Sequence, residues 1–407
     1  MPPVELPGTP NLRYLARQPI LDLHNSVAGY ELLFRDGPAG FLTAINSDRA
    51  SMTTMDSSLL LGAASLTGGK RAFINCTREL LVSGLVTLLP PDLTVLEILE
   101  DIEPDDEVLL SCRKLRAQGY SLAMDDFVGK NSGSPFLELV KYVKVDLRAT
   151  TRDEQKALAR ELSRHGVTLI AEKVETHEDY DFVVNLGFSL FQGYYFCRPV
   201  TLATRDIPTT AQKHLRLLQA SHAPKLDLRG LEELIRPEVA LCYRLLRYLN
   251  SAAFGLYPIR SIRHALTLLG EREIRKWIAL VTTAMLAQNK PAELVRMAMV
   301  RGRFCESFAP PDREEDYFLT GLFSLLDAML DRPMDHLVHD LPIADECRVA
   351  LLGADNPITR TIHLCEHCER GDFDIPTLDP AQPPVELIWR RYHETTLWAE
   401  SVLAASL

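Results

Sequence analysis

The sequence predicts an N-terminal α/β domain, a (β/α)8 barrel, followed by an all-α domain. Up to about residue 200, short apolar segments alternate with amphipathic stretches, a pattern typical of βαβ units and a parallel sheet. Beyond that point the strand pattern largely disappears, and apolar residues recur at helical spacing. Six or more βα units in about 200 residues fit a barrel, although the pattern also allows an open doubly wound sheet.

Six strands are predicted in the first half, each from a short run of apolar and β-favouring residues. In chain order they are 72–75 (AFIN), 93–99 (LTVLEIL), 120–124 (YSLAM), 142–146 (YVKVD), 167–172 (VTLIAE) and 188–193 (FSLFQG). Two of the intervening segments, 105–119 and 151–166, are amphipathic and end in glycine, which favours helix termination.

The second half is expected to be mainly helical. Leu241, Leu245 and Leu249, for example, fall at a spacing of four residues and form one helical stripe. A segment containing proline and threonine around residue 200 marks the boundary. The predicted domains are therefore residues 1–203 and residues 204–407.

Composition excludes several classes of protein. With 46% hydrophobic and 24% charged residues, the chain is neither fibrous nor wholly disordered. Its net charge of −11 disfavours nucleic acid as a partner. The longest apolar runs, such as 277–287, are far shorter than the roughly 20 residues that span a bilayer, so no membrane association is expected. The N-terminus has no signal-peptide pattern and the eight cysteines form no disulfide framework, which together predict a cytoplasmic location.

Polar residues occur at or near the ends of almost every predicted strand. They are Glu31, Asn75, Glu97, Glu100, Asp125, Asp126, Lys144, Glu172 and Gln192. In a barrel such ends converge on one mouth, where active sites are built. Carboxylates with one amide suit Mg²⁺, Mn²⁺ or Ca²⁺ better than zinc, and two adjacent aspartates can serve two ions. Capping of the following helices would explain any single acid, but not the amides and the lysine.

In the same order along the chain, these residues lie in motifs that resemble the EAL domain, the cyclic-di-GMP phosphodiesterase barrel. Glu31-Leu32-Leu33 stands for the Glu-Ala-Leu signature. The segments FINCT, LEILE, MDDF, VKVD, AEKVET and FQGYYF resemble the family's Asn-bearing strand and its E-x-T-E, MDDFG, KID, AEGVET and QGYYF motifs. The resemblance implies a TIM-like barrel.

The resemblance also implies a role for each matching residue. The implied metal ligands are Glu31, Asn75, Glu97, Asp125 and Asp126. The implied catalytic residues are Lys144 and Glu172, which orient and deprotonate the attacking water, with Glu175 and Gln192 supporting them. Arg35 would contact the nucleotide phosphate, and Glu100 would anchor the loop after the aspartate pair. The implied cofactor is Mg²⁺ or Mn²⁺, with Ca²⁺ inhibitory, and the implied ligand is cyclic di-GMP.

Three positions depart from the family pattern. Leu32 replaces the alanine of the signature, and Lys173 replaces a glycine. By strand alternation, Lys173 is expected to face the surrounding helices. The loop at 127–137, FVGKNSGSPFL, stands where the family has its DFGTGYSSL stretch, and the distance from Asp125 to Lys144 is about two residues shorter than in the family. It is expected to loosen the second metal site and the dimer contact, and so to reduce turnover more than binding.

The C-terminal half resembles an HDOD domain through the run at 236–255 and the IRSIRHALTLLG segment at 259–270. Ser324 and Leu325 stand where an HD enzyme has His-Asp, so no catalytic dinuclear site is expected there. Together the two halves resemble a bacterial two-domain signalling protein. The favoured hypothesis is metal and cyclic-di-GMP binding with weak or lost hydrolysis, coupled to a protein partner of the HDOD domain. The alternative is an active phosphodiesterase that forms linear pGpG. The resemblance is compatible with a homodimer.

Overall fold

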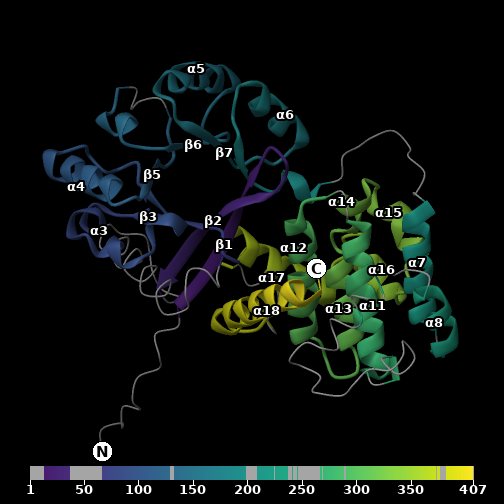
Figure 1. Ribbon diagram of the computed structural model, residues 1–407. Helices are drawn as coiled ribbons and strands as arrows, with labels where there is room; N and C mark the ends of the chain where they lie inside the picture. The colour runs from purple at the N-terminus through teal and green to yellow at the C-terminus, as the bar shows by residue number, and fades with distance from the viewer. Residues whose placement is uncertain are drawn as a thin grey trace, which may run out of the picture. The chain divides into compact units, whose positions relative to one another are not determined.

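The computed structural model describes residues 13–36, 67–128, 133–198, 209–223, 225–236, 241, 245, 266–267, 269–287, 290–372, 374–375 and 382–406. The chain divides into two compact units (Figure 1). The first comprises Met1–Tyr195 and His367–Arg390, and the second comprises Phe196–Glu366 and Arg391–Leu407. Among the residues described, no helix is both long and apolar enough to cross a membrane.

The first unit is a closed barrel of eight strands that neighbour one another in chain order. They are β1 (Arg13–Asp22), β2 (Val27–Asp36), β3 (Arg71–Cys76), β4 (Thr94–Ile98), β5 (Ser121–Met124), β6 (Tyr142–Asp146), β7 (Thr168–Glu172) and β8 (Leu190–Gln192). The predicted barrel is therefore confirmed over the open sheet, and β3 to β8 correspond to the six predicted strands.

The direction of one strand, β1, differs from that of the corresponding strand in a regular (β/α)8 barrel. β1 runs antiparallel to both β2 and β8, whereas the pairs from β2–β3 to β7–β8 are parallel. The reason lies in the short connection between β1 and β2, which leaves no room for a crossover helix. The Asp22 carboxylate accepts hydrogen bonds from the backbone N–H groups of His24 and Ser26, and Asn25 has φ 57°. These contacts fold the chain into a hairpin.

The barrel interior is an apolar layer to which most strands contribute one side chain. Its buried members are Ile20, Phe73, Val95, Ala123, Tyr142 and Ile170, with Leu190 packed against them. Since side chains alternate across a strand, the next inward-facing position lies two residues further along. On the parallel strands this position is nearer the carboxyl end, so it forms a second layer at the barrel mouth.

Four helices of the barrel unit follow strands β3, β4, β6 and β7. They are α3 (Arg78–Ser83), α4 (Asp106–Ala117), α5 (Arg152–Leu162) and α6 (His177–Asn185). The predicted helices at 105–119 and 151–166 match α4 and α5. Thr151 and Glu154 form a capping box that starts α5, a signal beyond the amphipathic pattern from which this helix was predicted.

The second unit is helical throughout its described part, as predicted. Its helices are α7 (Thr209–Ser221), α8 (Leu228–Ile235), α11 (Glu271–Leu286), α12 (Ala292–Ser307), α13 (Glu314–Phe323), α14 (Leu326–Leu330), α15 (Met334–Leu337) and α16 (Asp345–Leu351), with parts of α17 (Pro357–Arg370) and α18 (Val385–Ser406). Trp277 of α11 is 1% exposed within an apolar cluster that includes residues of α7 and α8. Helices α12 and α13 approach closely at Gly321, where a Cβ would lie 2.5 Å from the Arg301 carbonyl oxygen.

The segment His367–Arg390 belongs to the barrel unit although it lies far along the chain. Gln18 of β1 donates from Nε2 to the Arg370 carbonyl oxygen at 2.7 Å. Residues 199–208 lie outside the described residues, so the boundary between 203 and 204 stays a prediction.

Candidate functional site

The second layer of the barrel interior is polar. Its members lie two residues beyond the apolar layer on their strands: Gln18, Glu31, Asn75, Glu97, Asp125, Lys144, Glu172 and Gln192. The structure thus brings seven of the sequence-predicted site residues to one end of the barrel. Sequence reasoning missed Gln18, because no strand was assigned to 13–22; the apolar residues Leu15, Ile20 and Leu21 there were the available signal.

Lys144 lies at the centre of this layer, and its side chain is 1% exposed. Its Nζ contacts four carboxylates: Glu31 Oε2 at 3.1 Å, Glu97 Oε1 at 3.0 Å, Asp125 Oδ1 at 2.8 Å and Glu172 Oε1 at 2.9 Å. A single ammonium therefore faces four acids in a water-poor environment. The layer as a whole carries an excess of negative charge that suits a cation.

The two amide side chains orient Glu31. Asn75 donates from Nδ2 to Glu31 Oε1 at 3.2 Å, and Gln192 donates from Nε2 to Glu31 Oε2 at 2.7 Å. Gln192 also donates to Gln18 Oε1 at 2.7 Å. Both amides thereby present an oxygen, rather than a nitrogen, to the rest of the layer.

Burial dominates the electrostatics of the acids. It raises the pKa of Glu97 well above its usual range and raises the pKa of Asp125, although Lys144 opposes both shifts. Burial likewise raises the pKa of Glu172 to about 8. For Glu31, Lys144 and the two amides outweigh burial, so its pKa is lowered. Burial disfavours the charge of Lys144, but the surrounding carboxylates raise its pKa well above normal. Lys144 is therefore charged, and its single positive charge is too little to keep all four surrounding acids ionised at their usual pKa values.

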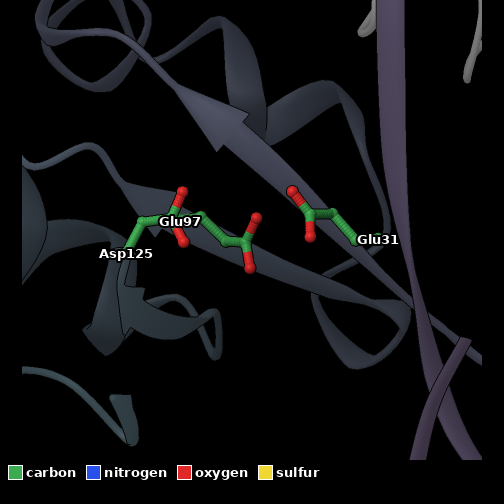
Figure 2. Close-up of side chains that lie close together, drawn as sticks. All are labelled: Glu31, Glu97 and Asp125. Carbon is green, nitrogen blue, oxygen red and sulfur yellow. The ribbon is translucent and has the colours of Figure 1, made fainter. Parts of the chain in front are cut away.

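The donors in this layer fit a divalent metal ion. Two groups of three carboxylates each offer oxygens within 4.8 Å of one another: Glu31, Glu97 and Asp125; and Asp125, Asp126 and Glu172. Figure 2 shows the side chains of the first group close together at the barrel mouth.

Several buried oxygens also lack a hydrogen-bond donor: Asn75 Oδ1, Glu97 Oε1 and Oε2, Glu172 Oε2 and Gln192 Oε1. Glu97 Oε1 nevertheless lies 3.0 Å from the charged Nζ of Lys144. Hard oxygen donors of this kind are the ligands that Mg²⁺, Mn²⁺ and Ca²⁺ prefer.

Backbone hydrogen bonds to neighbouring strands fix the aspartate pair. The N–H of Asp125 donates to the Ile98 carbonyl oxygen at 3.0 Å, and the N–H of Phe127 donates to the Lys144 carbonyl oxygen at 2.9 Å. Asp126 lies between these two anchors, with φ 42°. The altered loop begins at Phe127, whose N–H forms the second of these anchors, and its residues 129–132 lie outside the described part of the chain.

Gly193 holds the ends of β7 and β8 together beside Glu172 and Gln192. Its φ is 147°, and a Cβ there would lie 2.1 Å from the Val174 carbonyl oxygen. The N–H of Val174 donates to the Gln192 carbonyl oxygen at 3.0 Å. Any larger residue at 193 would push the two strand ends, and the two polar side chains, apart.

Comparison with known proteins identifies both halves of the chain. The EAL domain model matches residues 42–199 and the HDOD domain model matches residues 207–324. The cyclic di-GMP phosphodiesterase CdgJ of Vibrio cholerae is 34% identical over 369 residues, which cover 88% of this chain and 85% of CdgJ. The chain belongs to the EAL–HDOD proteins. The uncharacterised protein YuxH of Bacillus subtilis is 33% identical over 405 residues, covering 96% of this chain and 99% of YuxH.

Solved structures resemble the EAL part of the chain. The calcium and cyclic-di-GMP complex of Klebsiella pneumoniae BlrP1 is 27% identical, covers 49% of this chain and 58% of that protein, and has a TM-score of 0.40. The match to the EAL domain model begins after Glu31, so the signature Glu31-Leu32-Leu33 lies outside the matched span.

The expectation for Lys173 is wrong. Lys173 follows the last residue of β7 and has φ 54°, so strand alternation no longer applies to it. Instead of facing the surrounding helices, the side chain is 61% exposed and its Nζ donates to the Asp146 carboxylate. Asp146 lies directly opposite Glu172 in the β6–β7 register. Lys173 and Asp146 are thus close to the mouth of the EAL barrel, and neither of these two residues was assigned to it from the sequence.

Two further predicted site residues, Glu175 and Glu100, lie outside the polar layer. Glu175 is half-exposed, and its Oε1 lies 3.7 Å from Arg148 Nε. Glu100 is exposed after β4, where burial and repulsion from Asp126 and Asp125 raise its pKa. Arg35 belongs to β2, but its side chain is outside the described residues.

In the HDOD part, Ser324 and Leu325 follow α13. The Ser324 hydroxyl donates to the Gly321 carbonyl oxygen at 2.8 Å, and Leu325 is 3% exposed in the core. Groups of three or more acidic, histidine or cysteine ligands occur, within the described residues, in the EAL barrel alone.

Proposed function

We propose that the EAL barrel binds cyclic di-GMP through divalent cations at its mouth, with low turnover, and that the HDOD part passes the signal to a protein partner. The observation that carries this proposal is the layer of buried oxygens without donors. An unpaired buried acceptor is costly, and a cation at the mouth would satisfy several of them at once. The cation would be Mg²⁺ or Mn²⁺, with Ca²⁺ supporting binding without hydrolysis, and the protein would act in the cytoplasm.

Under this proposal each residue of the layer has a defined task. Glu31, Asn75, Glu97 and Asp125 would hold one cation, and Asp125, Asp126 and Glu172 would hold a second. The bound cations would supply positive charge for a phosphate group and acidify a water molecule. Glu172 would accept the proton of that water, and Lys144 would stabilise negative charge that develops on the phosphate. Gln192 would keep Glu31 in place, and Arg35 would contact the nucleotide phosphate.

The low turnover follows from the loop between β5 and β6. The aspartates are fixed by backbone anchors, but the segment after Phe127 departs from the EAL pattern in both length and residues. A site that must hold its groups within about 0.5 Å depends on such supporting segments. One observation favours the alternative, an active phosphodiesterase: the oxygens of Asp125, Asp126 and Glu172 lie within 4.8 Å of one another.

The test is a turnover assay of the full chain with cyclic di-GMP in Mg²⁺ and in Mn²⁺, alongside calorimetry of nucleotide binding in Ca²⁺. We expect binding in Ca²⁺ and slow formation of linear pGpG in Mn²⁺. Glu97→Gln should abolish nucleotide binding, whereas Glu107→Gln on the outer surface of α4 should not. Absence of binding by the wild-type chain would overturn the proposal, and rapid turnover would establish the active enzyme.

A further inference from the structure

Lys173 occupies an unusual backbone position for a lysine. It follows Glu172 directly, and its φ of 54° is a left-handed conformation that glycine adopts freely and a lysine does not. The turn carries the side chain to Asp146, on the neighbouring strand β6. The chain therefore places an ammonium group beside the carboxyl ends of β6 and β7, at the edge of the second carboxylate group.

Asp146 holds this ammonium in place. It is 4% exposed, and its Oδ1 accepts hydrogen bonds from the N–H of Arg148 at 2.6 Å and of Ala149 at 3.2 Å. Its Oδ2 accepts from Lys173. Because both oxygens are engaged, Asp146 is a rigid anchor for the lysine, although the lysine side chain itself is largely exposed.

The charge of Lys173 acts mainly on the second carboxylate group. Lys173 follows Glu172 directly, and Asp146, which holds its ammonium group, lies opposite Glu172 in the β6–β7 register. The hydrogen bond to Asp146 raises the pKa of Lys173, and the charges of Asp126 and Glu172 raise it further. Asp126 and Glu172 both belong to the second group. Lys144 contacts acids of both groups, so Lys173 is an additional positive charge beside the second group. A fixed positive charge at this place opposes the entry of another cation.

We propose that Lys173 sets the cation stoichiometry of the EAL mouth, by weakening cation binding at Asp125, Asp126 and Glu172 relative to binding at Glu31, Glu97 and Asp125. The inference rests on the proposed function, since it assumes that the mouth binds divalent cations. The effect of Lys173 would be a second cause of low turnover, independent of the altered loop. Hydrolysis that needs both cations is slow in any molecule whose second carboxylate group holds no cation.

The experiment is a titration of the full chain with Mn²⁺, in which free Mn²⁺ is followed by electron paramagnetic resonance. For the wild-type chain we expect one tight and one weak binding event. Lys173→Gln should tighten the weak event by roughly tenfold and leave the tight event unchanged, because it removes one nearby charge. Lys173→Arg should behave as the wild type, because it keeps the charge. Lys173→Gly should behave as Lys173→Gln, because it relieves the backbone and also removes the charge.

The outcomes separate the two proposals. Equal weak-site affinity in Lys173→Gln and the wild type would overturn this inference and leave the proposed function intact. A tightened weak site in Lys173→Arg would also overturn it, since the effect would not depend on charge. Failure of every variant and of the wild type to bind stoichiometric Mn²⁺ would overturn the proposed function itself.

Discussion

Lys144 supplies the positive charge that its four neighbouring carboxylates share at the EAL mouth, so its removal should lower the stability of the fold. Lys144→Met leaves four carboxylates around an apolar side chain, and we expect a loss of about 3–5 kcal/mol in the free energy of unfolding at pH 7 without divalent cation. Saturating Mn²⁺ should recover part of this loss, because it replaces the missing positive charge. Urea unfolding with and without Mn²⁺ measures both effects. Unchanged stability in the variant would show that the acids are neutral in the folded chain.

His222, in the HDOD part, makes stability depend on pH. Burial and the charge of Arg275 lower the pKa of His222 to about 4, and its Nδ1 lies 3.0 Å from the Leu218 carbonyl oxygen. Glu315 Oε1 lies 3.5 Å from its Nε2. The unfolded chain binds a proton at this histidine near pH 6.5, so between pH 6.5 and 4 the unfolded state takes up more protons and folding stability falls as the pH falls. At pH 5 the loss attributable to this residue is about 2 kcal/mol.

His222→Gln removes this titration. The measurement is the urea midpoint of the variant and of the wild type at pH 7.5 and at pH 5. We expect the wild type to lose more stability than the variant over this range. Parallel pH profiles for the two proteins would contradict the low pKa.

At the scale of the element, the proposed function implies that the loop between β5 and β6 limits hydrolysis at the mouth. Replacing residues 128–132 with the EAL family's GTGYSSL sequence, at the family's full length after Phe127, should raise turnover of cyclic di-GMP by at least about tenfold, because correct positioning of the reacting groups accelerates a reaction by that much or more. The replacement keeps Ser134, which caps the short helical turn bearing the buried Phe136 and Leu137. Mn²⁺ affinity should change little, since the replacement leaves the backbone hydrogen bonds of Asp125 and Phe127 in place. Grafts that bind Mn²⁺ normally yet gain no activity would refute this role for the loop.

The elements of the barrel show which structural features the sequence can predict and which it cannot. Strands β3 to β8 were predictable, because each is a short apolar run with its polar residue near the end, and the amphipathic pattern with a final glycine made α4 and α5 predictable. The antiparallel β1 was not assigned, since its direction depends on a hairpin set by the Asp22 carboxylate. Lys173 was misplaced because strand alternation assumes extended backbone, and nothing in the sequence reports its φ of 54°. The charge contacts of Lys144 likewise depend on barrel closure, which no local pattern encodes.

At the scale of the whole molecule, one residue should control the metal content of the chain. Asp125 is the only member shared by the two carboxylate groups found among the described residues, and both groups belong to the EAL barrel. Asp125→Asn should therefore reduce stoichiometric Mn²⁺, measured by mass spectrometry after dialysis of the full chain, to near zero. Asp327→Asn is the matched control: this largely buried carboxyl of the HDOD part has a pKa raised by burial, and it belongs to neither group. The control should keep the wild-type metal content. If Asp125→Asn retained one Mn²⁺ per chain while Asp327→Asn lost one, the metal would lie in the HDOD part, and the assignment of cation binding to the EAL barrel alone would be wrong.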